Sequence, residues 1–146
     1  MKKIIYLTLV SLLTISVCAC SDDDEPISPL QLPQAARTFL AQFFPTYDVR
    51  SVEKDGHHDD TEYTVTFTNG YEVEFDASGE WTDVDAPDGL AIPDGIAPAT
   101  IAEYVVTYYP GDGINEISRD RRGYDVDLIS GTDLVFTLTG DLVSIN

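Results

Sequence analysis

The sequence carries one pattern twice, and this internal duplication constrains the fold more than any other feature. The first copy begins at Leu32 and the second near Ile96. When the copies are aligned, Phe43-Phe44-Pro45 falls on Tyr108-Tyr109-Pro110. The other matched positions are Pro33 with Pro98, Phe39 with Tyr104, Leu40 with Val105, Val52 with Ile117, Tyr63 with Tyr124, Phe75 with Phe136, Gly79 with Gly140 and Trp81 with Leu142. The register slips by four residues around Gly56–Thr61, which a longer hairpin loop in the first copy explains.

Each copy opens with the pattern of an amphipathic helix. Pro33 suits the first helical turn, where a missing N–H costs nothing, and Pro45 ends the helix. Between them, apolar residues recur at three- and four-residue spacing and so share one face. They are Ala36, Phe39, Leu40, Phe43 and Phe44 in the first copy, and Ile101, Tyr104, Val105, Tyr108 and Tyr109 in the second. Because so short a helix is marginal alone, its aromatic face must pack on another element.

Alternating apolar and polar residues follow each helix and predict β-strands. Tyr63–Phe67 and Tyr71–Phe75 alternate with a period of two, and Asn69-Gly70 between them predicts a two-residue hairpin turn. The other predicted strands contain Val49 and Val52, Trp81 and Val84, Ile114 and Ile117, Tyr124–Leu128, Leu134–Phe136, and Leu142–Ile145. Each copy is therefore expected to form one helix followed by an antiparallel meander.

We predict an α+β fold of two tandem repeats, residues 32–84 and 96–146, each one helix packed on a four-stranded antiparallel meander. The segment 85–95 between them (DAPDGLAIPDG) holds two prolines and two glycines and predicts a linker. A unit of about 50 residues buries too little surface to be stable alone. The repeats are expected either to join their sheets into one eight-stranded surface or to dock side by side.

The first residues have the composition of a lipoprotein leader. Lys2 and Lys3 precede an apolar run, Ile4–Val17, that is too short for a comfortable membrane span. The run ends in Cys18-Ala19-Cys20, which resembles a lipobox and predicts a signal peptide at residues 1–19 with diacylation of Cys20. An ordinary signal peptide with a leftover cysteine is the alternative. Acyl chains on Cys20 would anchor the protein to a membrane.

Residues 20–31 (CSDDDEPISPLQ) are acidic, contain two prolines and predict a tether. The Ser-Asp run after Cys20 resembles the export signal of surface-exposed lipoproteins in some Gram-negative anaerobes. It predicts an outer membrane lipoprotein exposed at the cell surface, or otherwise one facing the periplasm. With Cys18 cleaved and Cys20 acylated, no thiol remains for a disulfide, so a packed core must supply the stability.

The chain is strongly acidic, with 26 Asp and Glu against 8 Lys and Arg and a formal net charge of −18. This balance argues against nucleic-acid binding, which requires basic patches that displace counterions, and against peripheral binding to anionic lipid. The solubility of an exported protein explains most of the charge. A cationic partner or association with divalent ions would explain the remainder.

Two clusters carry side chains of the kinds that bind metal ions. His57, His58, Asp59 and Asp60 are adjacent in the sequence, but neighbours in a strand point to opposite faces, so a solvated hairpin tip is the favoured interpretation. Asp83–Asp94 partly matches a calcium-binding loop, but its third Asp comes one place late and Asp occupies the position of the final Glu. Turn formation explains these residues more simply. We expect no bound metal ion or cofactor.

Exposed strand positions are the candidate partner surface. Glu72 with Glu74, and Asp125 with Asp127, are spaced to share one face of a strand. Such pairs can also flank a sugar in glycosidases, but a solvated sheet face requires the same spacing. Arg119, Arg121 and Arg122 form a basic cluster, interpreted as an exposed turn that pairs with nearby acidic residues or as a contact patch. No nucleophile–base motif indicates an enzyme.

Several of these motifs together resemble one family. Leu-Pro before the helix, Phe-Phe-Pro or Tyr-Tyr-Pro at its end, the Tyr63–Phe67 strand, Asn69-Gly70, Phe75-Asp76 and Gly79-x-Trp81 are similar to the PepSY-like repeat, whose proteins are also described as similar to β-lactamase inhibitor protein. The second copy departs from the pattern, with Phe136-Thr137 and with Leu142 in place of Trp81. The resemblance implies exported, non-catalytic tandem repeats. We therefore expect a non-enzymatic lipoprotein that binds or inhibits a protein, and alternatively one that binds or senses divalent cations.

Overall fold

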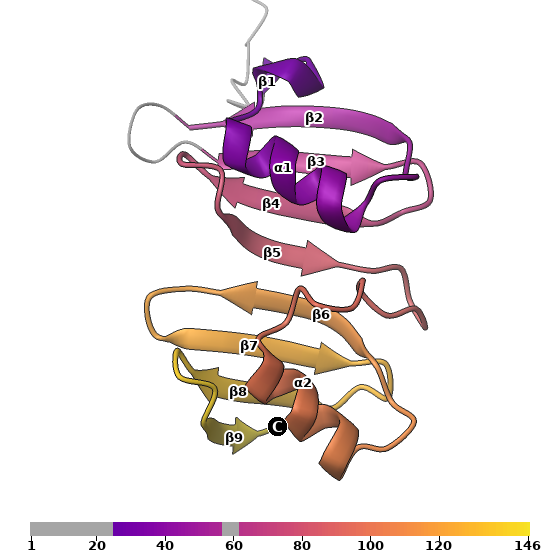
Figure 1. Cartoon of the computed structure of the whole chain (residues 1–146), viewed down its shortest axis with the longest axis vertical. Coiled ribbons are helices and arrows are strands. Elements are labelled where there is room, and N and C mark those ends of the chain that lie inside the picture. The colour runs from indigo at the N-terminus through magenta and orange to yellow at the C-terminus, as the bar shows by residue number, and fades with distance from the viewer. Residues whose placement is uncertain (1–24, 57–61) are drawn as a thin grey trace, which may run out of the picture.

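The computed structural model describes residues 25–56 and 62–146 and contains one antiparallel sheet, whose nine strands lie in the order of the chain (Figure 1). The strands are β1 (Glu25–Pro26), β2 (Val49–Asp55), β3 (Glu62–Phe67), β4 (Glu72–Asp76), β5 (Trp81–Asp85), β6 (Ile114–Arg119), β7 (Gly123–Leu128), β8 (Asp133–Thr137) and β9 (Leu142–Ile145). The helices are a 3-10 turn η1 (Pro29–Gln31), α1 (Gln34–Phe43) and α2 (Ala99–Tyr108).

The predicted fold class, an α+β protein of two tandem helix-on-four-strand repeats, is wrong. The described chain is mostly β, and β5 pairs with β6 to make one continuous sheet, with Val84 opposite Ile117. A further strand that the sequence did not predict, β1, pairs with β2 through Glu25 and Lys54. Separate four-stranded units would leave their inner edges unpaired, and the β5–β6 pair satisfies those backbone groups.

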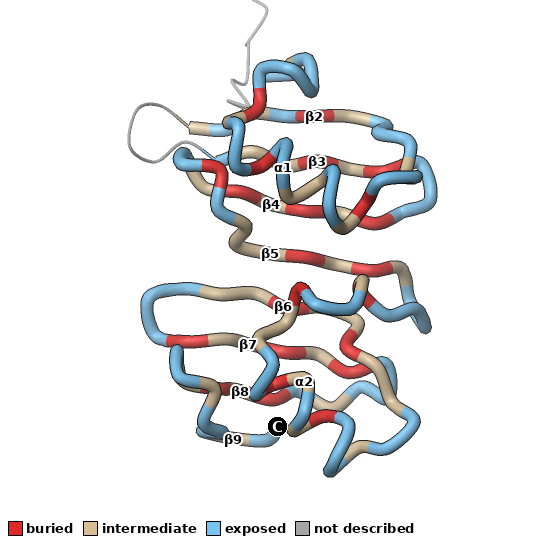
Figure 2. Tube along the Cα trace, viewed as in Figure 1, coloured by how far each residue is buried: buried red, intermediate tan, exposed pale blue. Residues whose placement is uncertain are grey.

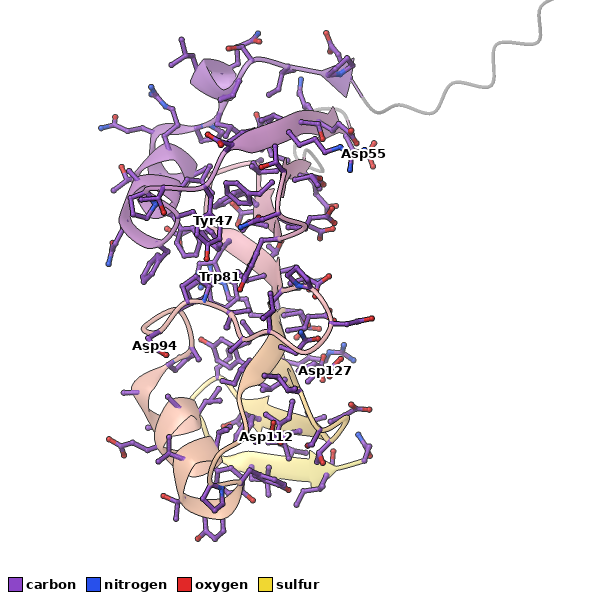
Figure 3. All side chains as sticks on the ribbon, turned by 90° about the vertical axis from the view of Figure 1, so that its right-hand side faces the viewer. Tyr47, Asp55, Trp81, Asp94, Asp112 and Asp127 are labelled. Carbon is purple, nitrogen blue, oxygen red and sulfur yellow. The ribbon has the colours of Figure 1, made fainter. Side chains whose placement is uncertain are left out.

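Both α-helices cover the same face of this sheet, as the edge-on view shows (Figure 3). The N–H of Phe44 donates to the carbonyl of Leu40 at 2.8 Å at the end of α1, and Tyr109 donates to Val105 at 2.8 Å at the end of α2. An aromatic pair then fixes each helix to the sheet. Phe39 packs edge-to-face on Phe75 with 5.6 Å between the ring centroids, and Tyr104 packs the same way on Phe136 with 5.4 Å between the centroids.

One aliphatic row crosses the helix-covered face from β2 to β9. Each member lies opposite the next across neighbouring strands, and the row passes the β5–β6 pair without interruption. Figure 2 shows buried segments on the strands on both sides of that pair. Its members are Val52, Val65, Val73, Val84, Ile117, Val126, Leu134 and Ile145. All but Ile145 are buried within a single hydrophobic core. Burial of this row is what holds the sheet together as one unit.

The segment between β5 and α2 packs against the body of the protein. The side-chain amide of Asn115 donates to the carbonyls of Ala86, Pro87 and Leu90 at 2.9–3.1 Å. The Tyr71 hydroxyl donates to the Ala91 carbonyl at 2.9 Å. Ile92 and Ile96 are buried in the core. None of the helices in the described ranges is long and apolar enough to cross a membrane.

Candidate functional site

The sheet face turned away from the helices carries two rows of carboxylates. In the first row, strand pairing places Glu72 opposite Asp85, Asp85 opposite Glu116, Glu116 opposite Asp127, and Asp127 opposite Asp133. In the second row, Glu74 lies opposite Asp83, and Ser118 separates Asp83 from Asp125. We call these eight carboxylates the acidic face; Asp127 is labelled on this side of the sheet in Figure 3.

The alternation of each strand explains why these side chains gather on one face. Val73, Val84, Ile117 and Val126 point into the core, so the residues on either side of each must point away from it. Directly opposite side chains in an antiparallel pair lie about 5 Å apart at Cβ, and like charges in that position destabilise a sheet. The acidic face therefore stores electrostatic repulsion.

Basic side chains do not neutralise this face. Within the described residues, strands β3 to β8 place no Lys or Arg on it. The ion pairs in the same residues, Arg119 with Glu80 at 3.1 Å and Arg122 with Asp120 at 2.7 Å, involve none of the eight carboxylates. Glu72 accepts a hydrogen bond from the Thr66 hydroxyl at 3.0 Å. The negative charge of the face is left to solvent or to a partner.

Partial burial and mutual repulsion raise the pKa of five of these carboxyls. Burial is the largest cause in each case, and neighbouring acidic groups add to it. In addition to burial, the charges of Glu62 and Glu72 raise the pKa of Glu74, and those of Glu72, Asp88 and Asp127 raise the pKa of Asp85. The charges of Asp127 and Asp85 raise the pKa of Glu116 in the same way. Those of Asp133 and Asp125 raise the pKa of Asp127.

Asp83 is the most strongly affected group. Burial, followed by the charges of Glu116, Glu74 and Asp85, raises its pKa from 3.8 to about 7. A hydrogen bond with Glu116 also favours the protonated Asp83, because only a protonated carboxyl can donate to a second carboxylate. Asp83 is therefore partly protonated near neutral pH, close to Glu116 at the junction of β5 and β6.

The structure brings together part of the predicted partner surface. Glu72, Glu74, Asp125 and Asp127 all lie on the acidic face. Arg119 lies on the opposite side of the sheet, with its guanidinium carbon 4.8 Å from the centre of the Trp81 ring and its Nε donating to the Trp81 carbonyl at 2.6 Å.

Arg121 and Arg122 lie in the β6–β7 hairpin. The Arg122 Nε donates to the carboxylate of Asp120 at 2.8 Å, within the same turn. The arginines are therefore not gathered on the acidic face with the predicted carboxylates, although Arg122 lines a hollow together with Asp125.

Sequence reasoning missed Asp83, Asp85, Glu116 and Asp133 as members of this surface. Asp83 and Asp85 are candidate ligands of a calcium loop by sequence, but both belong to strand β5. The available signal was Val84, an apolar residue flanked by two aspartates, which predicts an inward side chain between two outward ones. The β5–β6 pairing, which places these aspartates beside Glu116, carries no such local signal.

The carboxylates of this surface are spread out and do not form a metal centre. In residues 25–56 and 62–146, no three His, Cys, Asp or Glu side chains are arranged to hold a metal ion. The predicted candidates His57, His58, Asp59 and Asp60 lie outside the described residues, and so does the predicted lipidation site, Cys20.

Comparison with known proteins gives one family. The family model described as "Putative beta-lactamase-inhibitor-like, PepSY-like" matches residues 61–144. A search of the curated proteins finds no match.

Solved structures of the same kind come from Bacteroides. A "putative calcium-regulated periplasmic protein" of Bacteroides thetaiotaomicron is 39% identical, with a TM-score of 0.81 over 86% of this chain and 98% of the relative. A "putative periplasmic protein" of Bacteroides vulgatus is 37% identical, with a TM-score of 0.82 over the same shares. A second B. vulgatus protein, of unknown function, is 27% identical, with a TM-score of 0.78 over 84% and 98%. All three are described as periplasmic, which supports a cell-envelope location for this chain.

Proposed function

Because this chain belongs to the PepSY-like family of β-lactamase-inhibitor-like proteins, we propose that it is a non-enzymatic protein of the cell envelope that binds a basic protein partner. The acidic face is the proposed binding surface. The observation that carries the proposal is the pairing of like charges across five neighbouring strands, β4 to β8, whose own residues place no Lys or Arg on that face.

Repulsion within the face favours a cationic partner on energetic grounds. Lys or Arg side chains placed between the two rows would remove the repulsion that raises the pKa of Asp83 and its neighbours. The binding of such a partner would therefore stabilise the protein as well as the complex.

The dimensions of the face suit a basic helix or hairpin. Five strands at about 4.8 Å spacing span about 19 Å, and the two rows lie about 7 Å apart along the strands. The carboxylates follow extended rows and do not converge on one point, which favours binding over acid–base catalysis.

Acylation of Cys20 is proposed to attach the protein to the outer membrane, with the folded part exposed at the cell surface. Strand β1 begins at Glu25, so five residue steps separate the anchor from the sheet, a reach of at most about 18 Å. The β1 edge would then face the membrane, and the β9 edge at the opposite end of the sheet would face away from it (Figure 1).

Fractionation tests this attachment. The Cys20→Ala protein is expected to move from the membrane pellet to the soluble fraction and to lose incorporation of labelled palmitate. A parent protein that incorporates no label would contradict acylation, and a Cys20→Ala protein that stays in the pellet would contradict attachment through Cys20.

Affinity capture from the cell envelope tests the binding surface. The Cys20→Ala protein is compared with a neutral-face variant that also carries Glu74→Gln, Asp83→Asn and Asp127→Asn. A control carries Asp48→Asn, Asp94→Asn and Glu103→Gln, which remove the same number of formal charges outside the eight carboxylates of the acidic face. A partner captured by the parent and by the control, lost with the neutral-face variant and released by salt supports the proposal. Equal capture by all three proteins would contradict it.

Divalent-cation binding is the second proposed function. The specific observation in its favour is that one relative, 39% identical, is described as calcium-regulated. The carboxylates of the acidic face do not converge on one point, so calcium would associate with them along the two rows, through oxygen atoms of the kind that it prefers. Calcium would then stabilise the protein more than magnesium at equal ionic strength.

A further inference from the structure

The two edges of the sheet are unequal. Strand β1 closes one edge with two residues, a glutamate and a proline, and both features discourage the addition of another strand. Strand β9 closes the other edge with Leu-Val-Ser-Ile, which has no charge, proline or glycine. Natural proteins ordinarily protect a free sheet edge with charged residues or proline. Among the residues that the structure describes, the β9 edge is therefore the one left open to pairing.

The backbone of β9 is available for hydrogen bonding. The backbone N–H of Asn146 donates to the carbonyl of Asp133 at 2.9 Å, and the N–H of Asp133 donates to the carbonyl of Asn146 at 3.4 Å. Hydrogen-bonded and non-hydrogen-bonded pairs alternate along antiparallel strands, so the N–H and C=O of Ile145 point away from β8. Because β9 is the last strand of the sheet, no strand of the described chain receives these groups. They form a template for one more antiparallel or parallel strand.

The side chains of β9 are exposed as well. The exposed fractions are 38% for Leu142, 62% for Val143 and 53% for Ile145, values that are high for apolar residues in a strand. Leu142 and Ile145 lie opposite Phe136 and Leu134, so they belong to the helix-covered side of the sheet. An added strand with apolar residues on that side would extend the aliphatic row by one position.

The open side of the same edge has different chemistry. A hollow of about 270 Å³ lies there, with Val135 and Val143 as apolar lining and Asp120 and Asp125 as acidic lining. Arg122 also lines it but is paired with Asp120. The aliphatic part of a lysine can cover the two valines while its ammonium group reaches Asp125. A glutamate of the partner at the same position would be repelled by the carboxylates of the acidic face.

We propose that the β9 edge accepts an extended segment of a partner protein as a tenth strand, in which apolar residues alternate with lysine or arginine. The apolar residues cover Leu142 and Ile145, and the basic residues lie over the hollow and the end of the acidic face. The basic character of the segment rests on the proposed function, whereas the strand addition rests on the β9 edge alone. A second copy of this chain fits less well, because pairing two β9 strands would bring together two strongly acidic molecules.

The test uses a synthetic peptide of about ten residues with alternating valine and lysine, added to the Cys20→Ala protein. Amide hydrogen exchange of Ile145 is measured by NMR with and without the peptide. Strand addition is expected to slow this exchange by about tenfold or more, because the outward N–H becomes hydrogen-bonded. Two control peptides are used: one with the same residues in a valine block and a lysine block, and one with alternating valine and glutamate.

Variants at Ile145 separate backbone pairing from side-chain contact. Ile145→Pro removes the outward N–H but leaves the Asp133–Asn146 bonds in place, and it is expected to weaken binding of the alternating peptide by about tenfold. Ile145→Ala keeps that N–H and is expected to bind the peptide with a smaller loss. Thermal unfolding of both variants shows whether the fold is retained.

Several results would overturn the inference: no protection of Ile145, equal binding of the block peptide, equal binding of the valine–glutamate peptide, or self-association through β9. Binding that is lost in the neutral-face variant but unchanged in Ile145→Pro would leave the proposed function standing and remove the edge inference. Binding that is lost in Ile145→Pro and only weakened in the neutral-face variant would support the edge inference.

Discussion

Asp85 of β5 lies directly opposite Glu116 of β6, in the strand pair that joins the two halves of the sheet. On the other side of the same pair, Val84 lies opposite Ile117, and both are fully buried. Core burial therefore holds two carboxylates side by side that would otherwise separate. The acidic face is a consequence of the single sheet, since it exists only while β5 and β6 are paired.

Asp83→Asn is expected to stabilise the protein at alkaline pH and to flatten its pH dependence. The pKa of Asp83 is about 7 in the folded protein, against 3.8 for an unperturbed aspartate, so the folded state holds more protons between these values. Stability from this group is present below pH 3.8 and is lost as the pH rises through 7. After allowance for solvent screening, the gain at pH 8 is on the order of 1 kcal/mol. Thermal unfolding from pH 5 to pH 8 checks this.

Asp112→Asn is the control with the opposite sign. Hydrogen bonds from Ser130 and from the backbone N–H of Gly113 lower the pKa of Asp112, so its carboxylate stabilises the fold at neutral pH. The substitution is expected to lower the melting temperature at pH 7. A lower melting temperature for Asp83→Asn at pH 8 would contradict the account of the acidic face.

Cations in general are expected to stabilise the protein. Raising NaCl from about 0.05 to about 0.5 M screens the repulsion between the carboxylate rows and should raise the melting temperature, less so in the neutral-face variant. Calcium and magnesium at equal ionic strength should then act alike. A calcium-specific shift of several degrees, abolished by EDTA, would instead favour the cation-binding proposal.

Gly79→Ala is expected to be more destabilising than Gly89→Ala. Both glycines have positive φ, +85° and +78°, so both substitutions strain the backbone. A Cβ on Gly79 would also lie 2.7 Å from the Cβ of Pro33 and 2.9 Å from the nitrogen of Ala36, at the start of α1, whereas nothing lies within 4 Å at Gly89. We expect a loss of about 1 kcal/mol for Gly89→Ala and at least about 2 kcal/mol for Gly79→Ala. Equal losses in urea unfolding would contradict this contact.

Local periodicity predicted the elements better than their assembly. The helix pattern from Ala36 to Phe44 corresponds to α1, and the alternation of Tyr63–Phe67 corresponds to β3. The family was also predicted correctly from these motifs. Such features depend on residues close together in the sequence, where the periods of helix and strand are directly visible.

The assembly depended on contacts between distant residues. Nothing local in Trp81–Asp85 indicates that β5 pairs with Ile114–Arg119, 29 residues or more later. A bulge between Glu74 and Phe75 also shifts the register, so that Asp83 and not Thr82 lies opposite Glu74. The acidic tether composition likewise gave no sign that Glu25–Pro26 would pair with β2. Which strands pair at the edges of a sheet depends on the backbone N–H and C=O groups that the inner strands leave unpaired, and these groups cannot be identified from local sequence.

Zero-length cross-linking in intact cells tests the central claim most directly. A carbodiimide activates carboxylates, and a lysine amine in contact displaces the activating group to form an amide. Products that use a carboxylate of this protein therefore join its Asp or Glu to a lysine of the partner. The account predicts that the linked carboxylates belong to the acidic face, led by Glu74, Asp85, Glu116 and Asp127, and that they join one basic protein. Cross-links confined to the helix side, at residues such as Asp94 and Glu103, would contradict it.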